Sequence, residues 1–276
     1  MSARQAACGP VAASGPARSQ TFVTGFARGL QVIEAFAGAA GPLSLAEVAG
    51  RAGVDRAVAR RMLLTLIELG FVGRVNRHFQ LTPRIMRLGY AFLSQNGLDG
   101  LIRPFLAELT QKLGESCSLS VLDGVESVAV CHVTATIRKS GLLMREGSRW
   151  PAYVMASGRV LFSALPDDEV RQRLRRMELR PLTEKTLTTP DAIVQAVGTA
   201  RRQGYALVDG ELEDGLASAS VPVRDRAGVL VAALNTSTQK SRRSPAELRR
   251  EVVPVLLATA AEMGRALPDG AFLSGA

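Results

Sequence analysis

Five arginines lie close together in the chain, and guanidinium groups are well suited to hold phosphate. Arg56, Arg60 and Arg61 fall within one helical pattern, whereas Arg74 and Arg77 belong to the tip of a short hairpin pattern. Arg56 is near the start of its helix, where a side chain can reach base edges, and the hairpin arginines are placed to meet backbone phosphates. The spacing therefore predicts contact with a nucleic acid.

Two short helices and a small β-hairpin over residues 44–82 must position these arginines. Gly53 can supply a positive φ between the helices, and Asp55 is expected to cap the second helix by accepting backbone N–H bonds. Apolar residues at helical spacing are expected to bury the inner face of that helix, namely Val58, Met62, Leu66 and Leu69. A helix-turn-helix is also a common packing unit in proteins that never bind DNA, and Arg61 can instead form a buried ion pair.

Positive charge is concentrated in the same part of the chain. Residues 1–96 contain eleven arginines, no lysine and four acidic residues, and so carry +7 of the formal net charge of +9. A polyanion would bind this part of the chain, although a solvated basic face is the alternative. An anionic membrane is disfavoured because no strongly amphipathic basic helix stands apart from the predicted core.

Several function classes are disfavoured by what the sequence lacks. Three cysteines and two histidines form no spaced cluster, so no metal site or disulfide framework is expected. No Gly-x-Ser-x-Gly elbow, Walker loop or dinucleotide-binding glycine loop is present, and we expect no cofactor. No apolar run reaches the roughly 18–20 residues that span a bilayer. The N-terminal residues lack the apolar core of a signal peptide, and the expected location is cytoplasmic.

An enzyme would have to use the remaining candidate groups. Glu211, Glu213 and Asp214 are conceivable acid–base partners, but they stand in a glycine-flanked turn with no histidine nearby, where solvated loop residues are expected. Cys117 and Cys131 lie on apolar strand patterns and are predicted to be core residues rather than nucleophiles. The enzyme hypothesis is therefore the least favoured.

Composition and periodicity divide the chain into five parts. Residues rich in Ala, Gly, Ser and Pro predict a disordered tail at the start, and Pro83 can begin a linker helix. The predicted parts are a tail (1–21), a helix-turn-helix domain (22–82) that opens with a helix over 26–36, a linker helix (83–96), a larger domain (97–266) and a second tail (267–276). Residues 96–100 are predicted to form a hinge.

The linker helix has apolar residues on more than one side. Ile85, Leu88 and Phe92 share one side, and Met86 and Tyr90 lie near another. Such a helix has more than one partner, which is either a second protomer or the interior of one domain.

The larger domain mixes strand and helix patterns, which indicates an α+β fold similar to a sensor domain. Strands are expected at 117–122, 127–133, 142–145, 205–209, 217–223 and 229–235. Helices are expected at 101–113, 157–165, 167–176, 190–203 and 245–266.

Both halves together resemble the IclR family of bacterial transcription regulators over about residues 22–266. The supporting segments include Leu45-Ala-Glu-Val-Ala49, Leu69-Gly-Phe-Val72, Gly204-Tyr-Ala-Leu-Val-Asp-Gly-Glu211 and Gly215-Leu-Ala-Ser-Ala-Ser-Val-Pro-Val223. Their order and spacing together are specific. Residues 22–30 and Pro151-Ala-Tyr153 are most similar to the branch that controls catabolism of aromatic acids, such as the protocatechuate and β-ketoadipate regulators.

The resemblance implies a winged helix-turn-helix, a linker helix that dimerises and a GAF-like effector domain. It implies a ligand-responsive regulator, dimeric or tetrameric, that binds palindromic double-stranded operator DNA and has RNA polymerase as a further partner. Ala57 stands where the family often has Ser or Thr, so a hydroxyl contact is lost there. The residues expected to contact DNA are Ser44, Arg56, Ala57, Arg60, Arg61, Arg74 and Arg77.

The resemblance also places an effector between the sheet and the helix that begins near Ser157. A small organic acid suits unsatisfied N–H groups at a helix start, polar side chains on strands, and an apolar wall. The expected effector-binding residues are Leu142, Met144, Met155, Ala156, Ser157, Ser218, Ser220, Asn235 and Ser237. The alternatives are solvent-facing serines, a domain that only oligomerises, and a regulator of another catabolic pathway.

Overall fold

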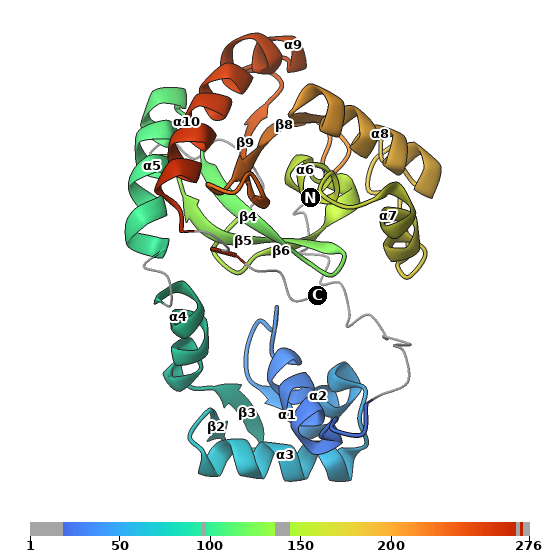
Figure 1. The fold of residues 1–276 in the computed structure, drawn as a ribbon. Coiled ribbons are helices and arrows are strands. Elements are labelled where there is room, and N and C mark those ends of the chain that lie inside the picture. Colours follow the sequence, from blue (N-terminus) through green and yellow to red (C-terminus); the bar gives the residue numbers. More distant parts are fainter. Residues whose placement is uncertain (1–18, 95–97, 136–143, 269–270, 273–276) are drawn as a thin grey trace. The chain divides into compact units, whose positions relative to one another are not determined.

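A computed structural model describes residues 19–94, 98–135, 144–268 and 271–272, and the chain divides into two compact units between Leu93 and Ser94. In the first unit three helices pack beside a small antiparallel sheet with strand order β1-β3-β2 (Figure 1). The elements are α1 (Thr24–Glu34), β1 (Leu43–Ser44), α2 (Leu45–Ala52), α3 (Arg56–Glu68), β2 (Val72–Val75) and β3 (His78–Leu81).

The turn between α2 and α3 follows the predicted chemistry in part. Gly53 ends α2 with φ 64°, as predicted, and a residue with a side chain would be strained there. The prediction that Asp55 caps α3 through its side chain is wrong, because its carboxylate makes no capping hydrogen bond. Asp55 is exposed to water, and its backbone carbonyl instead accepts from the Ala59 N–H at 2.9 Å.

The prediction for the buried face of α3 is confirmed at Leu66 and wrong elsewhere. Ala59, Leu63 and Leu66 are buried, whereas Leu69 is 51% exposed. The predicted residues Val58 and Met62 are only half-buried. Apolar residues cover a wide arc of α3, and α1 and α2 pack on the side that contains Ala59 and Leu63, at spacing i and i+4.

The predicted linker helix is a 3₁₀ turn, η1 (Pro83–Ile85), followed by α4 (Met86–Ser94), and α5 (Leu98–Leu113) comes next. The predicted hinge is wrong at residues 98–100, because they already belong to α5. Its first two residues, 96 and 97, lie outside the described residues, as does nearly all of the predicted N-terminal tail.

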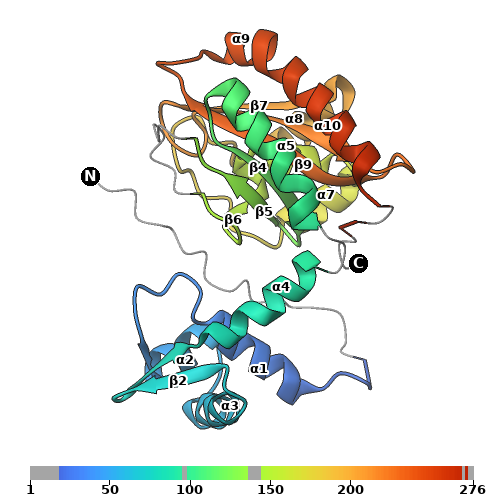
Figure 2. The same ribbon diagram turned by 90° about the vertical axis from the view of Figure 1, so that its left-hand side faces the viewer.

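The second unit is built on a six-stranded antiparallel sheet with strand order β6-β5-β4-β9-β8-β7. Helices α5 and α10 cover one face, and α6 covers the other, with α7 and α8 outside it (Figures 1 and 2). The strands are β4 (Cys117–Asp123), β5 (Glu126–Val133), β6 (Arg149–Pro151), β7 (Ala206–Asp209), β8 (Leu216–Arg224) and β9 (Leu230–Gln239). The helices are η2 (Ala152–Val154), α6 (Ala156–Phe162), α7 (Asp167–Leu174), α8 (Pro190–Gln203), α9 (Pro245–Glu247), η3 (Leu248–Val252) and α10 (Val253–Ala266).

This is the predicted α+β arrangement, with three main differences in its strands. The predicted strand at 142–145 is not seen in its described half, since Met144 and Arg145 lie in no strand, and residues 142–143 are outside the described part. Strand β6, paired with Glu126–Val128, was not predicted. Strand β9 continues to Gln239, so Ser237 lies within a strand.

Alternation along the strands gives the sheet two different faces. Leu119, Ala219 and Leu234 belong to the core beneath α5 and α10. Their polar neighbours, including Ser220 and Asn235, therefore face α6. A hydrogen-bonding surface thus lies inside the second unit.

Candidate nucleic-acid interface and ligand pocket

The predicted DNA-contacting residues of α3 form one exposed face. Arg56 and Arg60 are four residues apart, as are Ala57 and Arg61, so all four side chains are neighbours on the helix surface. Each is exposed, and the alternative that Arg61 forms a buried ion pair is therefore wrong. Three guanidinium groups on one face are suited to contact phosphates and base edges in a major groove.

The hairpin of β2 and β3 presents the other two arginines. Val75 pairs with His78, so Asn76 and Arg77 form a two-residue turn, and Asn76 has φ 55°. Arg74 is exposed, and its guanidinium carbon lies 5.8 Å from the centre of the Phe79 ring. This cation–π contact fixes the direction of Arg74 along the hairpin while its N–H groups can still bind phosphate.

Ser44 serves the fold at the start of α2. Its hydroxyl accepts from the Glu47 N–H at 3.3 Å, and the Glu47 carboxylate accepts from the Ser44 N–H at 2.8 Å. These reciprocal bonds are a capping box. The Ser44 hydroxyl also donates to the Glu47 carboxylate at 2.7 Å, and this bond, followed by the one from the Ser44 N–H, holds the pKa of the Glu47 carboxyl below its usual range. Whether Ser44 also contacts DNA stays a prediction.

Ser44→Ala should lower the stability of the first unit by about 1 kcal/mol, because the Glu47 N–H loses its acceptor. Ser44→Asn keeps an acceptor at the same position and should restore most of the loss. Thermal unfolding followed by circular dichroism measures both variants. An alanine variant as stable as the parent would show that the capping box contributes nothing.

A pocket in the second unit lies between the start of α6, the Val208–Leu216 stretch and strands β8 and β9. The space open to the centre of a water-sized sphere is about 10 Å³, and the wider empty volume of about 310 Å³ includes open solvent. One side is polar and the others are apolar, and none of the described lining residues is charged. The lining residues are Met144, Val154, Met155, Val208, Leu212, Leu216, Ser218, Asn235 and Ser237.

Five of the predicted effector-binding residues meet at this pocket: Met144, Met155, Ser218, Asn235 and Ser237. Ser218 pairs directly with Ser237 across β8 and β9. Asn235 precedes Ser237 by two residues on β9 and so lies on the same face of the sheet. Antiparallel pairing therefore gathers the three polar groups into one patch. That these residues bind an effector stays a prediction.

Ala156, Ser157 and Ser220 are not among the described residues that line this pocket. Ser157 is fully buried, and its hydroxyl bonds the Ser127 hydroxyl at 2.8 Å. The Ser220 hydroxyl donates to the Leu234 carbonyl at 2.9 Å, and Ala156 is packed in the core beneath α6. Leu142 lies outside the described residues.

Asn235 has an unmet hydrogen-bonding capacity. Its side chain is 3% exposed, and Oδ1 has no hydrogen-bond partner among the described residues. A buried acceptor without a partner costs about 1–3 kcal/mol unless a water or a ligand donates to it. The pocket therefore has a built-in site for a donor group.

Four apolar lining residues were not predicted: Val154, Val208, Leu212 and Leu216. Period-two spacing on β8 would have placed Leu216 beside Ser218. The position of Val208 follows only from its pairing with Ser218, and Leu212 is brought in by a loop. Strand order and the path of a loop belong to the tertiary structure, and a local sequence pattern does not predict them.

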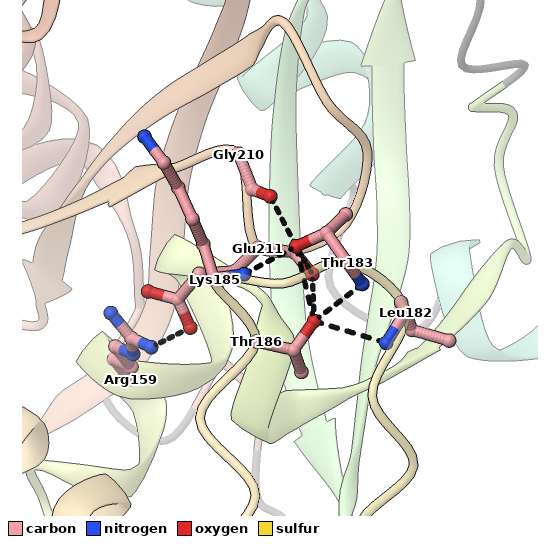
Figure 3. Close-up of polar contacts among 7 residues, drawn as sticks. All are labelled: Arg159, Leu182, Thr183, Lys185, Thr186, Gly210 and Glu211. Carbon is pink, nitrogen blue, oxygen red and sulfur yellow. Dashed lines mark hydrogen bonds and ion pairs between the residues drawn. The ribbon is translucent and has the colours of Figure 1, made fainter.

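The expectation that Glu211 is a solvated loop residue is wrong. It is 8% exposed and forms an ion pair with Arg159 of α6, which is 5% exposed (Figure 3). Both charged side chains are therefore largely shielded from water. Asp214 in the same loop is exposed, as predicted.

The two strand cysteines are core residues, as predicted. Cys117 and Cys131 are both buried, and desolvation raises the pKa of the Cys117 thiol to about 11. A thiol with this pKa is almost entirely protonated at neutral pH and is a poor nucleophile. No set of three His, Cys, Asp or Glu side chains in the described ranges is arranged to hold a metal ion. Within those same ranges, no helix has the length and apolar character needed to cross a membrane.

Comparisons with known proteins agree across both units. The IclR helix-turn-helix domain model matches residues 26–75, and the model of the bacterial transcriptional regulator IclR C-terminal domain matches residues 90–265. The Pca regulon regulatory protein of Pseudomonas putida is 35% identical over 260 residues, covering 92% of this chain and 89% of that protein.

Two further proteins support the same assignment. The p-hydroxybenzoate hydroxylase transcriptional activator of Acinetobacter baylyi is 33% identical over 250 residues, covering 89% of this chain and 92% of that protein. The crystal structure of a transcriptional regulator from Rhodococcus sp. RHA1 is 40% identical with a TM-score of 0.74, covering 89% of this chain and 98% of that one.

Proposed function

The chain belongs to the IclR family of bacterial transcriptional regulators, and from that premise we propose that it controls genes for aromatic-acid catabolism in response to a small organic acid. The family consists of DNA-binding regulators rather than enzymes. Two relatives that are at least 33% identical over most of the chain are named as regulators of the Pca regulon and of p-hydroxybenzoate hydroxylase. These names support an aromatic acid, or a product of its degradation, as the effector.

The exposed arginines are proposed to divide the work of DNA binding. Arg56, in the first turn of α3, reads a base in the major groove, and Arg60 and Arg61 reinforce this contact along the same face. Arg74 and Arg77 on the hairpin bind backbone phosphates and fix the position of the domain on the duplex. Ala57 contributes shape only, since it has no donor.

The pocket is proposed to hold the acid through neutral groups. Ser218 and Ser237 donate hydroxyl hydrogen bonds to the carboxylate, and the buried Asn235 Oδ1 accepts from a hydroxyl group of the ligand or from a bridging water. The unpartnered Oδ1 is the observation that carries this proposal. Met144, Val154 and Leu216 supply the apolar wall against which a ring packs.

A second protomer is proposed to complete the DNA-binding unit. On α4, Met86 is 70% exposed and Leu88 is 52% exposed, so none of the described residues covers this apolar surface. A two-fold dimer through α4 lets each protomer read one half-site of a palindrome. Such dimers can pair into tetramers. RNA polymerase is the expected further partner at the promoter. The expected location of the protein is the cytoplasm, where the operator lies.

Ser218→Leu should weaken acid binding about tenfold or more, because it removes a donor and places a branched side chain in the pocket. Ser220→Ala is the matched control, since Ser220 shares the strand and the face but bonds the Leu234 carbonyl instead. Calorimetry with 4-hydroxybenzoate, protocatechuate and β-ketoadipate measures both. Equal affinity of the parent and Ser218→Leu for an acid that binds would refute the assignment.

Thermal unfolding and DNA binding, measured with the same acids, separate this proposal from a C-terminal domain that only oligomerises. An acid that binds the native state stabilises it by RT ln(1 + [L]/Kd), so the melting temperature rises with the logarithm of the acid concentration once that concentration exceeds Kd. It changes DNA binding only if it prefers one conformation, and a tenfold preference corresponds to about 1.4 kcal/mol. A protein that none of these acids stabilises, and whose DNA binding none of them alters, would contradict the sensing role.

A further inference from the structure

A buried ion pair joins α6 to the loop that carries part of the pocket wall. Arg159 Nη2 donates to Glu211 Oε2 (Figure 3). Both side chains are at least nine-tenths shielded from water, at 6% and 10% exposure. The Arg159 Nε is also buried, and it has no hydrogen-bond partner among the described residues. A charged pair held in this way costs desolvation energy that its hydrogen bonding only partly returns.

The backbone of the same loop is held from a second direction. Thr186 Oγ1 donates to the Glu211 carbonyl at 2.6 Å, and Thr183 Oγ1 donates to the Gly210 carbonyl at 2.6 Å. Thr186 Oγ1 also accepts from the N–H groups of Leu182 and Thr183 at 3.0 and 2.9 Å, as Figure 3 shows. The side chain and the carbonyl of Glu211 are therefore both fixed, in different directions.

The loop fixed in this way supplies one wall of the pocket. Val208, Leu212 and Leu216 all line the pocket, and Glu211 directly precedes Leu212. The loop closes on itself through a hydrogen bond from the Gly210 N–H to the Leu216 carbonyl at 2.8 Å. Because Glu211 and Leu212 are consecutive residues in a short loop, a shift of the Glu211 backbone also moves Leu212.

We propose that Arg159 and Glu211 are positioning residues that set the shape of the ligand pocket by locking the Val208–Leu216 loop onto α6. The pair touches no ligand. It determines which ring substituents fit beside Leu212, and so contributes to selectivity among acids of similar charge. This inference rests on the proposed function for its ligand, but the locking of the loop is a property of the free protein.

The structural reason for a charged pair at this place is its directionality. Apolar packing is non-directional and tolerates several arrangements of a loop, whereas a guanidinium–carboxylate bond has a narrow geometry. Apolar replacement of a buried ion pair often keeps the fold while it removes this geometric constraint. The double variant Arg159→Met with Glu211→Leu should therefore fold with a loosened loop.

Hydrogen–deuterium exchange on the full chain tests the locking without any ligand. The Gly210 and Leu216 amides should exchange at least tenfold faster in the double variant than in the parent. Amides of β8 beyond Ala219 should be unchanged. The control is Glu169→Leu with Arg173→Met, which removes a partly exposed Arg–Glu pair on α7 and should leave the loop protected. Unchanged exchange at Gly210 and Leu216 overturns the inference.

Calorimetry with 4-hydroxybenzoate and 3-hydroxybenzoate on the same proteins tests selectivity. The double variant should bind each acid at least tenfold more weakly and should lose most of the parent's preference between the two. A parent-like affinity ratio in the double variant overturns the role in selectivity, even if the loop is looser. If the parent protein binds neither acid and neither acid changes its DNA binding, the proposed ligand class is refuted. Hydrogen exchange at Gly210 and Leu216 then still tests whether the ion pair locks the loop.

Discussion

Replacing Arg56 with alanine is expected to weaken binding to the operator by about 1–3 kcal/mol and to relax the preference at one base pair. Arg56 opens α3, is exposed, and lies on the same face as Arg60. A guanidinium group at this position can form two parallel hydrogen bonds with a guanine edge, and a methyl group can form none. Fluorescence anisotropy with the operator and with single-base variants measures both effects.

Arg77→Ala provides the comparison, because Arg77 occupies the turn between β2 and β3 and is expected to contact phosphate. The substitution should weaken binding to the operator and to non-cognate DNA to the same degree, and it should reduce the slope of log K against log[salt] by about one. Undiminished operator affinity and unchanged base preference in Arg56→Ala would remove Arg56 from the interface. Equal salt slopes for Arg77→Ala and the parent would show that Arg77 does not contact the DNA phosphates.

Local sequence patterns predicted the elements of the first unit better than their packing. Gly53 and the hairpin after α3 are found as predicted, although the hairpin turn is only Asn76-Arg77 and Arg74, predicted at the tip, lies in β2. Of the buried face of α3 only Leu66 was assigned correctly, because Val58, Ala59, Met62 and Leu63 are all apolar or small and periodicity alone allows more than one stripe. The positions of α1 and α2 decide between them, and that is tertiary information.

The candidate pocket also depends on tertiary contacts that local sequence patterns do not specify. Ser218, Asn235 and Ser237 could be predicted because strand alternation and the family resemblance both place them on one face. Ser157 could not be excluded from sequence, since its partner Ser127 is thirty residues away on another strand. The role of Glu211 was hidden for the same reason, because nothing near it in the chain signals that Arg159 lies beside it.

Glu211→Leu alone is expected to destabilise the second unit by about 3–5 kcal/mol, because Arg159 stays charged and buried with no carboxylate beside it. That loss is a large fraction of the 5–15 kcal/mol by which folded domains are stable. Chemical denaturation followed by tryptophan fluorescence reports on the correct unit, since Trp150 in β6 is the sole tryptophan of the chain.

Two further variants separate the ion pair from the loop itself. Glu213→Leu changes the same residue type two positions away, where no ion pair is seen among the described residues, and should change stability by less than about 1 kcal/mol. Adding Arg159→Met to Glu211→Leu removes the unpaired charge and should recover most of the lost stability. If the double variant were as unstable as Glu211→Leu, the cost would arise from lost contacts of the glutamate and not from an uncompensated guanidinium, since the second substitution removes the guanidinium alone.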